Sequence, residues 1–212
     1  MSEPPFSRSL PSFVKTGIVL DIGCGRGRYT SLLLKKGYTV VGIDINRLRL
    51  KQASKFADVI LGDCHTLSFK DRSFNLVCIL QVIHHIEEPQ KTLDEISRLL
   101  KDGGVLYVTE VVEDNPLFKL LRNINPSWEG DPVKTRLTRR ELRQMLNKRF
   151  SLIREDMSYG NFYWLWVVFV TQLNKDINII TKLIRFADRQ VDKILKNRFS
   201  CTYHAILRKR AL

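Results

Sequence analysis

Short apolar segments alternate with amphipathic ones along the first 112 residues. Each apolar segment is flanked by turn-forming residues, as is typical of buried strands. These predicted strands are 17–22, 38–44, 57–63, 73–80 and 105–112. Helical spacing of leucine and isoleucine, together with capping residues, predicts helices over 28–36, 47–56 and 89–100. Strands that are apolar on both faces and separated by helices indicate a parallel sheet covered on both sides.

The pattern changes after residue 112. A capping box from Thr138 to Glu141 begins a predicted helix that ends near Lys148, and 150–156 is a sixth predicted strand. Residues 161–198 are predicted to be helical, and 200–209 alternates like an antiparallel last strand. We therefore predict an α/β fold in one domain, 1–212, with a seven-stranded, mostly parallel sheet, helices on both faces and helices inserted before the last strand.

Composition and charge narrow the class of protein. Hydrophobic residues make up 44% and charged residues 27%, which is typical of a globular domain. The longest apolar run, 162–170, is about half of what a membrane span needs, and residues 1–13 lack a signal-peptide core. A cytoplasmic protein is expected. The four cysteines and four histidines show no zinc-site spacing, so no metal site is expected.

The excess positive charge lies near the C-terminal end. Residues 132–212 hold 18 basic and 6 acidic residues, or +12 of the net +13. The helix predicted over 176–198 has one apolar face, which includes Ala187, and an opposite basic stripe. The stripe consists of Lys182, Arg185, Arg189, Lys193 and Lys196. Such a helix can make a peripheral membrane contact or touch RNA phosphates, and a solvated outer face is the simpler alternative.

Glycines follow the first predicted strand at a spacing suited to a ligand. The turn reads Asp21-Ile22-Gly23-Cys24-Gly25-Arg26-Gly27. Glycines let the backbone approach a ligand closely, and the next helix presents its N-terminal amides there. A dinucleotide fingerprint would need a third glycine at position 28, where the chain has arginine. Acidic residues close the next two predicted strands, at Asp44 and within Gly62-Asp63-Cys64.

This turn resembles motif I of class I S-adenosylmethionine (SAM)-dependent methyltransferases. The segments 67–89 and 99–110 resemble the fourth-strand segment of that family and its turn into strand five. The matches cover about 17–112, and the inserted helices resemble those of the type 11 small-molecule group. The resemblance implies a Rossmann-like sheet whose SAM-binding core is 17–112. It also implies a helical cap, built from 115–148 and 161–198, over a small, partly apolar or lipid-linked acceptor.

Two alternatives to a small-molecule methyltransferase stay open. A tRNA wobble-uridine methyltransferase shares the glycine loop and an Ile-His-His segment, so an RNA acceptor is one alternative. The chain could also be a SAM-binding regulator that transfers no methyl group.

The resemblance assigns the glycine turn to the amino-acid end of SAM. It places Gly23, Gly25 and Gly27 along that part of the ligand, and Asp21 orients the loop. The residue types indicate that Cys24 is a small side chain filling a tight turn, because nothing nearby in the sequence would activate its thiol.

The same resemblance assigns the rest of the SAM site. Asp44 binds the ribose hydroxyls, and Ile45 packs on the adenine. Asp63 reaches the adenine amine, the Cys64 backbone amide binds a ring nitrogen, and Gln81 closes the site from strand four.

Two adjacent histidines are the candidates for a catalytic base. Such a base is needed only where the acceptor is a hydroxyl or a protonated amine. His84 and His85 lie in the loop after the fourth predicted strand, and His85 is the slightly favoured one. Glu110 and Glu113, near the end of strand five, are weaker candidates that are better explained as loop-ordering or solvated carboxylates.

Overall fold

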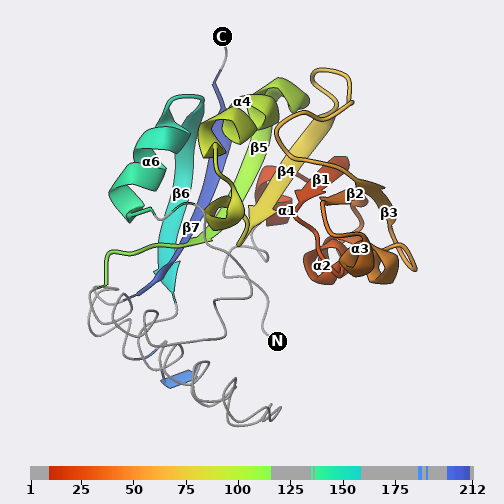
Figure 1. Ribbon diagram of the computed structural model, residues 1–212. Coiled ribbons are helices and arrows are strands. Elements are labelled where there is room, and N and C mark those ends of the chain that lie inside the picture. The colour runs from red at the N-terminus through yellow and green to blue at the C-terminus, as the bar shows by residue number, and fades with distance from the viewer. Residues whose placement is uncertain are drawn as a thin grey trace.

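The computed structural model describes residues 10–115, 135, 137–158, 186–187, 190 and 200–210. They form one seven-stranded sheet of order β3-β2-β1-β4-β5-β7-β6 (Figure 1). The strands are β1 (Ile18–Ile22), β2 (Thr39–Asp44), β3 (Asp58–Leu61), β4 (Phe74–Leu80), β5 (Leu100–Val111), β6 (Phe150–Ser158) and β7 (Thr202–Lys209). Strands β1 to β5 pair in parallel, and β7 is antiparallel to both β5 and β6. The predicted seven-stranded, mostly parallel sheet is therefore confirmed.

Helices pack on both faces of this sheet. They are α1 (Leu10–Phe13), α2 (Arg28–Lys35), α3 (Arg47–Ala53), α4 (Pro89–Leu99) and α6 (Arg139–Asn147), with a 3-10 turn η1 (Ile83–His85). One core cluster joins the sheet to α4 and α6, and a second joins it to α1 and α2. Neighbouring residues of β1, Val19 and Leu20, enter different clusters, because successive side chains of a strand point to opposite faces.

The helix starts follow the capping signals in the sequence. The Asn46 side chain accepts a hydrogen bond from the Arg49 amide at 3.0 Å and caps α3. At α6, Thr138 and Glu141 form the reciprocal capping box. Both predicted helix starts are confirmed.

Strand β5 begins earlier than predicted. The predicted start is residue 105, but Leu100 already pairs with Phe74. The next pair is Leu76 with Val105, so residues 101–104 bulge out between the two pairs. Leu100 and Phe74 are both buried, and their packing extends the pairing across the predicted Asp-Gly-Gly turn.

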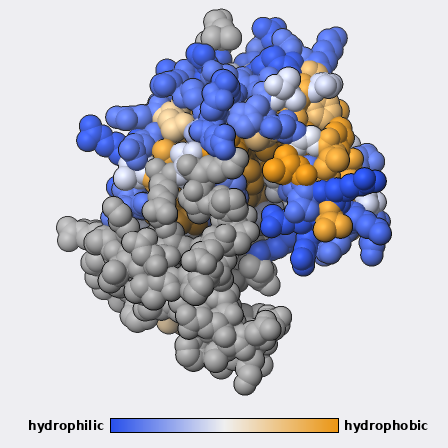
Figure 2. All heavy atoms as spheres, viewed as in Figure 1, coloured by the Kyte–Doolittle hydropathy of each residue, from blue (hydrophilic) through white to orange (hydrophobic). Residues whose placement is uncertain are grey.

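The edge strand β3 is more exposed than the apolar sequence of 57–63 suggests. Three of its four residues are exposed, because β3 is a short strand at the edge of the sheet. Apolar residues are exposed around it. They are Ile45, Leu48, Phe56, Ile60 and Leu61. Figure 2 shows apolar residues on the side of the molecule where β3 and α3 lie.

Most of the predicted cap lies outside the described residues, and so does the basic stripe. Within the predicted cap, α6 packs against the same core cluster as α4. Phe186, Ala187 and Gln190 are helical and exposed, although Ala187 falls on the face predicted to be apolar. None of the helices in the described ranges is long and apolar enough to cross a membrane.

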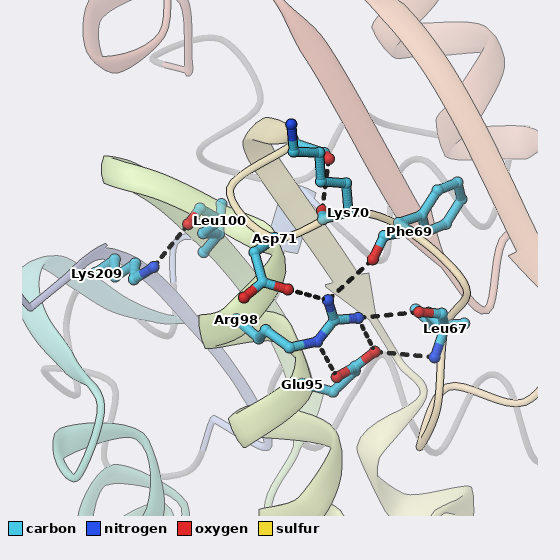
Figure 3. Close-up of polar contacts among 9 residues, drawn as sticks. Leu67, Phe69, Lys70, Asp71, Glu95, Arg98, Leu100 and Lys209 are labelled. Carbon is cyan, nitrogen blue, oxygen red and sulfur yellow. Dashed lines mark hydrogen bonds and ion pairs between the residues drawn. The ribbon is translucent and has the colours of Figure 1, made fainter.

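Arg98 of α4 connects this helix by hydrogen bonds to residues 67–71, the segment before β4 (Figure 3). Its guanidinium donates to both carboxylate oxygens of Glu95, to Asp71, and to the backbone carbonyls of Leu67 and Phe69. Glu95 also accepts a hydrogen bond from the Leu67 amide at 2.9 Å. The planar five-donor group of arginine suits this arrangement, because one side chain serves two carboxylates and two carbonyls.

We expect Arg98→Ala to lower the free energy of unfolding by about 1–2 kcal/mol, since two backbone carbonyls and Glu95 lose their donor. Urea unfolding measures the change. Arg72→Ala is the matched control, because among the described residues the Arg72 guanidinium pairs with the exposed Asp102 alone, at 3.4 Å, and its loss should change stability by less than about 0.5 kcal/mol. Equal losses in the two variants would show that the Arg98 contacts contribute no more than a surface ion pair.

Candidate active site

The carboxyl ends of β1 and β4 meet at the point where the strand order reverses. From β1 the chain moves to β2 and β3 on one side, and then to β4 and β5 on the other. Ligands of open α/β sheets bind at such a switch point, outside the carboxyl ends of the strands. Two of the predicted cofactor-binding residues lie within strands, Asp21 in β1 and Asp44 at the end of β2. The others lie in the segments that follow β1, β2, β3 and β4.

The three loop glycines have different surroundings. All three have positive φ, at 68° for Gly23, 54° for Gly25 and 77° for Gly27. A Cβ at Gly23 would lie 2.3 Å from Val82, and one at Gly27 would lie 2.8 Å from Ala53. A Cβ at Gly25 would meet only Asp44 Oδ2, at 3.8 Å. Gly23 and Gly27 therefore permit close packing within the protein, whereas the described residues leave space beside Gly25.

This difference predicts that one alanine substitution mainly lowers stability and the other mainly lowers ligand affinity. Gly27→Ala should lower the free energy of unfolding by about 1–2 kcal/mol, because the left-handed backbone and the contact with α3 both oppose a side chain. Gly25→Ala has the backbone cost alone and should weaken ligand binding more than it weakens the fold. Thermal unfolding and calorimetric SAM titration measure the two effects. If both variants lost stability equally and bound SAM equally, the assigned space at Gly25 would be wrong.

Asp44 connects the glycine loop to the end of β2. Its Oδ2 accepts a hydrogen bond from the Gly25 amide, and its Oδ1 accepts one from the Asn46 amide, both at 2.8 Å. A carboxylate offers about four lone-pair positions, so roughly two remain for hydroxyl donors. The structure thus gives Asp44 two tasks, holding the loop and presenting an acceptor beside the space at Gly25.

Asp21 lies beneath the loop, where its carboxyl is 2% exposed. Thr30 of α2 donates a hydrogen bond to its Oδ2 at 2.6 Å. Burial, with a smaller contribution from the negative charge of Asp44, raises the pKa of Asp21 to about 6. Asp21 therefore joins β1 to the first turn of α2, and this joint fixes the base of the glycine loop.

The thiols of Cys24 and Cys64 are placed for packing. The Cys24 amide donates to the Ile43 carbonyl at 2.9 Å, and its side chain fills the space beside Gly42. Burial and the nearby Asp21 and Asp44 charges raise the pKa of the Cys24 thiol to about 12. Burial also raises the pKa of Cys64, whose sulfur lies 3.6 Å from the Thr92 hydroxyl. Neither thiol is an activated nucleophile.

The segment after β3 presents a carboxylate, and the segment after β2 presents an exposed apolar side chain. Asp63 Oδ1 accepts hydrogen bonds from the His65 amide at 2.9 Å and from His65 Nδ1 at 2.5 Å. The amide of His65, followed by its ring, keeps the pKa of Asp63 below its ordinary value. Ile45 directly follows β2, and its side chain is 76% exposed. The potential metal-ligand atoms of Asp63, Cys64 and His65 lie within 4.8 Å of one another. However, Asp63 is already hydrogen-bonded to His65, and the Cys64 sulfur already contacts Thr92.

Gln81 adopts a backbone conformation that is unusual for a side-chain-bearing residue. Its φ is 62°, and its amide donates to the Thr109 carbonyl of β5 at 2.7 Å. This left-handed turn ends β4 and directs the chain into Val82, which packs on Gly23. Strained backbone of this kind occurs preferentially at functional sites.

The two candidate histidines lie in η1, just beyond Val82. His84 Nδ1 is 2.5 Å from Oε1 of the buried Glu110, and the two histidine rings have centroids 3.9 Å apart. The Thr135 amide donates to the His84 carbonyl at 3.1 Å, which fastens the turn from the other side. Sequence reasoning considered Glu110 only as a weaker catalytic candidate, because nothing in its spacing links it to His84.

Sequence reasoning also missed the residues that hold the site together. Each of these residues contacts one predicted site residue. The pairs are Thr30 with Asp21, Asn46 with Asp44, Val82 with Gly23, and His65 with Asp63. Thr30 and Asn46 had detectable signals, since each is a polar residue at the start of a helix. Val82 had no detectable signal, because an apolar residue after a strand predicts a packing contact without indicating its partner.

The acceptors, the apolar surface and the space at this edge suit SAM. The opening at Gly25 admits a ligand, Asp44 offers acceptors for two hydroxyls, and Ile45 offers an exposed apolar surface. The fold is that of class I SAM-dependent methyltransferases, and the site has the features expected of one. In agreement, residues 20–108 match the type 11 family model that is described as a methyltransferase domain.

Individual relatives give a more detailed comparison. The chain is 34% identical over 109 residues to the demethylmenaquinone methyltransferase of Renibacterium salmoninarum, a match covering 50% of this chain and 45% of that protein. It is 33% identical over 99 residues to the 2-methyl-6-phytyl-1,4-hydroquinone methyltransferase of Synechocystis, covering 43% and 31%. The chain thus spans about half the length, or less, of these curated relatives.

The whole fold is similar to a solved structure. The crystal structure of a SAM-dependent methyltransferase from Archaeoglobus fulgidus has a TM-score of 0.70 at 21% identity, covering 97% of this chain and 91% of that one. At 21% identity, this structural similarity establishes the fold and no more than the fold.

Proposed function

We propose that this protein transfers a methyl group from SAM to a small, partly apolar acceptor. The observation that supports this most directly is the pairing of Asp44 with Gly25. The carboxylate fixes the loop by a 2.8 Å hydrogen bond, and a Cβ at Gly25 would enter open space next to it. Methyl transfer from a sulfonium needs mainly alignment of donor and acceptor and exclusion of water. A rigid loop at a switch point provides that alignment.

In this proposal the chain holds SAM with residues from four strand ends. The loop at Gly25 receives the amino-acid end, and Asp44 accepts hydrogen bonds from the ribose hydroxyls. Ile45 packs on the adenine, the Asp63 carboxylate accepts from its amine, and the Cys64 amide donates to a ring nitrogen. Gln81 closes the site from β4. Gly23, Gly27, Asp21 and Cys24 act indirectly, since their observed contacts shape the loop.

The acceptor class is supported by the relatives. Two of them are named for a demethylmenaquinone and a phytyl hydroquinone, which are ring compounds with apolar tails. The aligned part of this chain is the SAM-binding half, so these names support an apolar acceptor without specifying which one. The proposed catalytic base is one of the two histidines in η1.

The test uses SAM with a labelled methyl group, incubated with the protein and extract from its own source. The extract is then separated into RNA, protein, organic-soluble and aqueous fractions. We expect label in the organic-soluble fraction and none in a control without protein. Label in RNA that nuclease removes would replace the small-molecule acceptor by RNA. SAM binding with no labelled fraction would favour a regulator that transfers no methyl group.

A further inference from the structure

A buried carboxylate holds His84 in one orientation. Glu110 of β5 is 1% exposed, and its Oε1 lies 2.5 Å from Nδ1 of His84. Its Oε2 accepts a hydrogen bond from the His84 amide at 3.3 Å, and its Oε1 also accepts one from the Val111 amide at 2.8 Å. A carboxylate bonded to one ring nitrogen fixes the imidazole tautomer and stabilises the ring when it gains a proton.

Burying a carboxylate is costly unless it is paired and hydrogen-bonded. Glu110 satisfies this requirement mainly through His84, and the two residues come from adjacent strand ends, after β4 and within β5. His85 has a different environment. Its ring packs against that of His84 with an interplanar angle of 50°, and its amide donates to the Val82 carbonyl. The structure therefore distinguishes two residues that the sequence leaves nearly equivalent.

The Glu110–His84 pair lies close to the donor site along the chain and in space. The turn η1 starts one residue after Val82, which packs on Gly23 of the glycine loop. The pair also lies at the carboxyl edge of β4 and β5, on the side of the switch point away from Asp44. In the SAM orientation proposed above, this side is left for the acceptor.

We propose that His84, positioned by Glu110, is the general base for a hydroxyl acceptor, such as a phenol or a hydroquinone. This inference rests on the proposed methyl transfer. The hydroxyl proton passes to Nε2 of His84, and an electron pair of the acceptor oxygen forms the bond to the methyl carbon. The methyl–sulfur bond breaks and its electron pair stays on sulfur. His84 then releases the proton to water. A thiolate or a neutral amine would need no such base.

The experiment combines the extract assay with carbon NMR of the product formed from SAM carrying a ¹³C-methyl group. We expect the new methyl carbon to be bonded to oxygen. His84→Ala should lower kcat about 100-fold or more, the usual contribution of a general base, with the Kd for SAM unchanged by calorimetry. Added imidazole should restore part of the His84→Ala rate. His85→Ala should lower kcat much less.

Glu110 has its own test as a positioning residue. Glu110→Gln should lower kcat at least about tenfold while KM for SAM stays unchanged, and Glu110→Asp should recover part of the rate. Glu88→Gln is the matched control, because Glu88 is an exposed carboxylate that pairs with Lys91. Circular dichroism confirms that each variant folds.

The outcomes separate this inference from the proposed function. A methyl carbon bonded to carbon, nitrogen or sulfur, or His84→Ala activity equal to wild type, would overturn the general-base assignment and leave methyl transfer intact. Loss of activity in His84→Ala without imidazole rescue and with a raised Kd for SAM would also overturn it, since His84 would then be structural. An absence of any labelled product from wild-type protein that binds SAM would overturn both.

Discussion

We expect the Asp44→Ala variant to bind SAM about 5- to 150-fold more weakly than wild type, a loss of roughly 1–3 kcal/mol. Two effects add. The ribose hydroxyls lose a charged acceptor, and the Gly25 and Asn46 amides lose the oxygens that they reach at 2.8 Å. The glycine loop then loses the bond that connects it to β2.

Isothermal calorimetry measures the SAM affinity of this variant. Asp58→Ala is the matched control, because Asp58 is an exposed acidic residue on the neighbouring strand, away from the loop. Asp44→Asn should be intermediate, since the amide keeps one acceptor oxygen and loses the charge. Wild-type affinity in Asp44→Ala would mean that the ribose lies elsewhere and would remove the main support for the proposed SAM orientation.

Two buried groups should give the unfolding free energy opposing responses to pH. His204 of β7 is 1% exposed, between the hydroxyls of Thr109 at 3.0 Å and Ser158 at 2.6 Å. Burial lowers the pKa of His204 to about 3 from an ordinary 6.5. Below pH 6.5 the unfolded chain therefore binds a proton that the folded chain refuses, and stability falls. At 1.36 kcal/mol per pKa unit, the loss by pH 4 is roughly 3 kcal/mol.

Asp21 acts with the opposite sign. Its folded pKa of about 6 lies above the ordinary 3.8, so the folded chain binds a proton before the unfolded chain does. Stability from this group rises as pH falls from about 6 towards 3.8, by roughly 2 kcal/mol. In wild type the two responses largely cancel, which hides both of them.

Single variants separate the two responses. Urea unfolding between pH 7 and pH 4 should show His204→Gln gaining stability relative to wild type as the pH falls. Asp21→Asn should lose stability relative to wild type over the same range. Curves that run parallel to the wild-type curve would show that neither group titrates as its burial implies.

The fold was predictable because each local signal agreed with the next. The apolar runs of β1, β2 and β4, the Asn46 cap and the Thr138–Glu141 box all specify the elements that the structure contains. The edge position of β3 was not predictable, since its pattern of apolar residues is also typical of a strand covered on both faces. The extension of β5 to Leu100 depends on pairing with Phe74, a contact that no local pattern encodes.

The sequence indicates which strand ends carry the candidate site residues, but not which residues they contact. The spacing of Gly23, Gly25 and Gly27 located the loop, but their separate surroundings come from Val82 and α3, which are distant in sequence. The same holds for His84. Its partner Glu110 is 26 residues away, and only the parallel pairing of β4 with β5 brings them together.

The place of β7 has a consequence for how the protein is synthesised. β6 pairs with β7, and β7 separates it from β5, so β6 joins the sheet only after residues 202–209 have left the ribosome. Until then the edge of β5 offers unpaired backbone groups to any neighbouring chain. A nascent or prematurely terminated chain should therefore depend on chaperones, and translation ending before residue 202 should give insoluble protein although the whole proposed SAM-binding segment has been made.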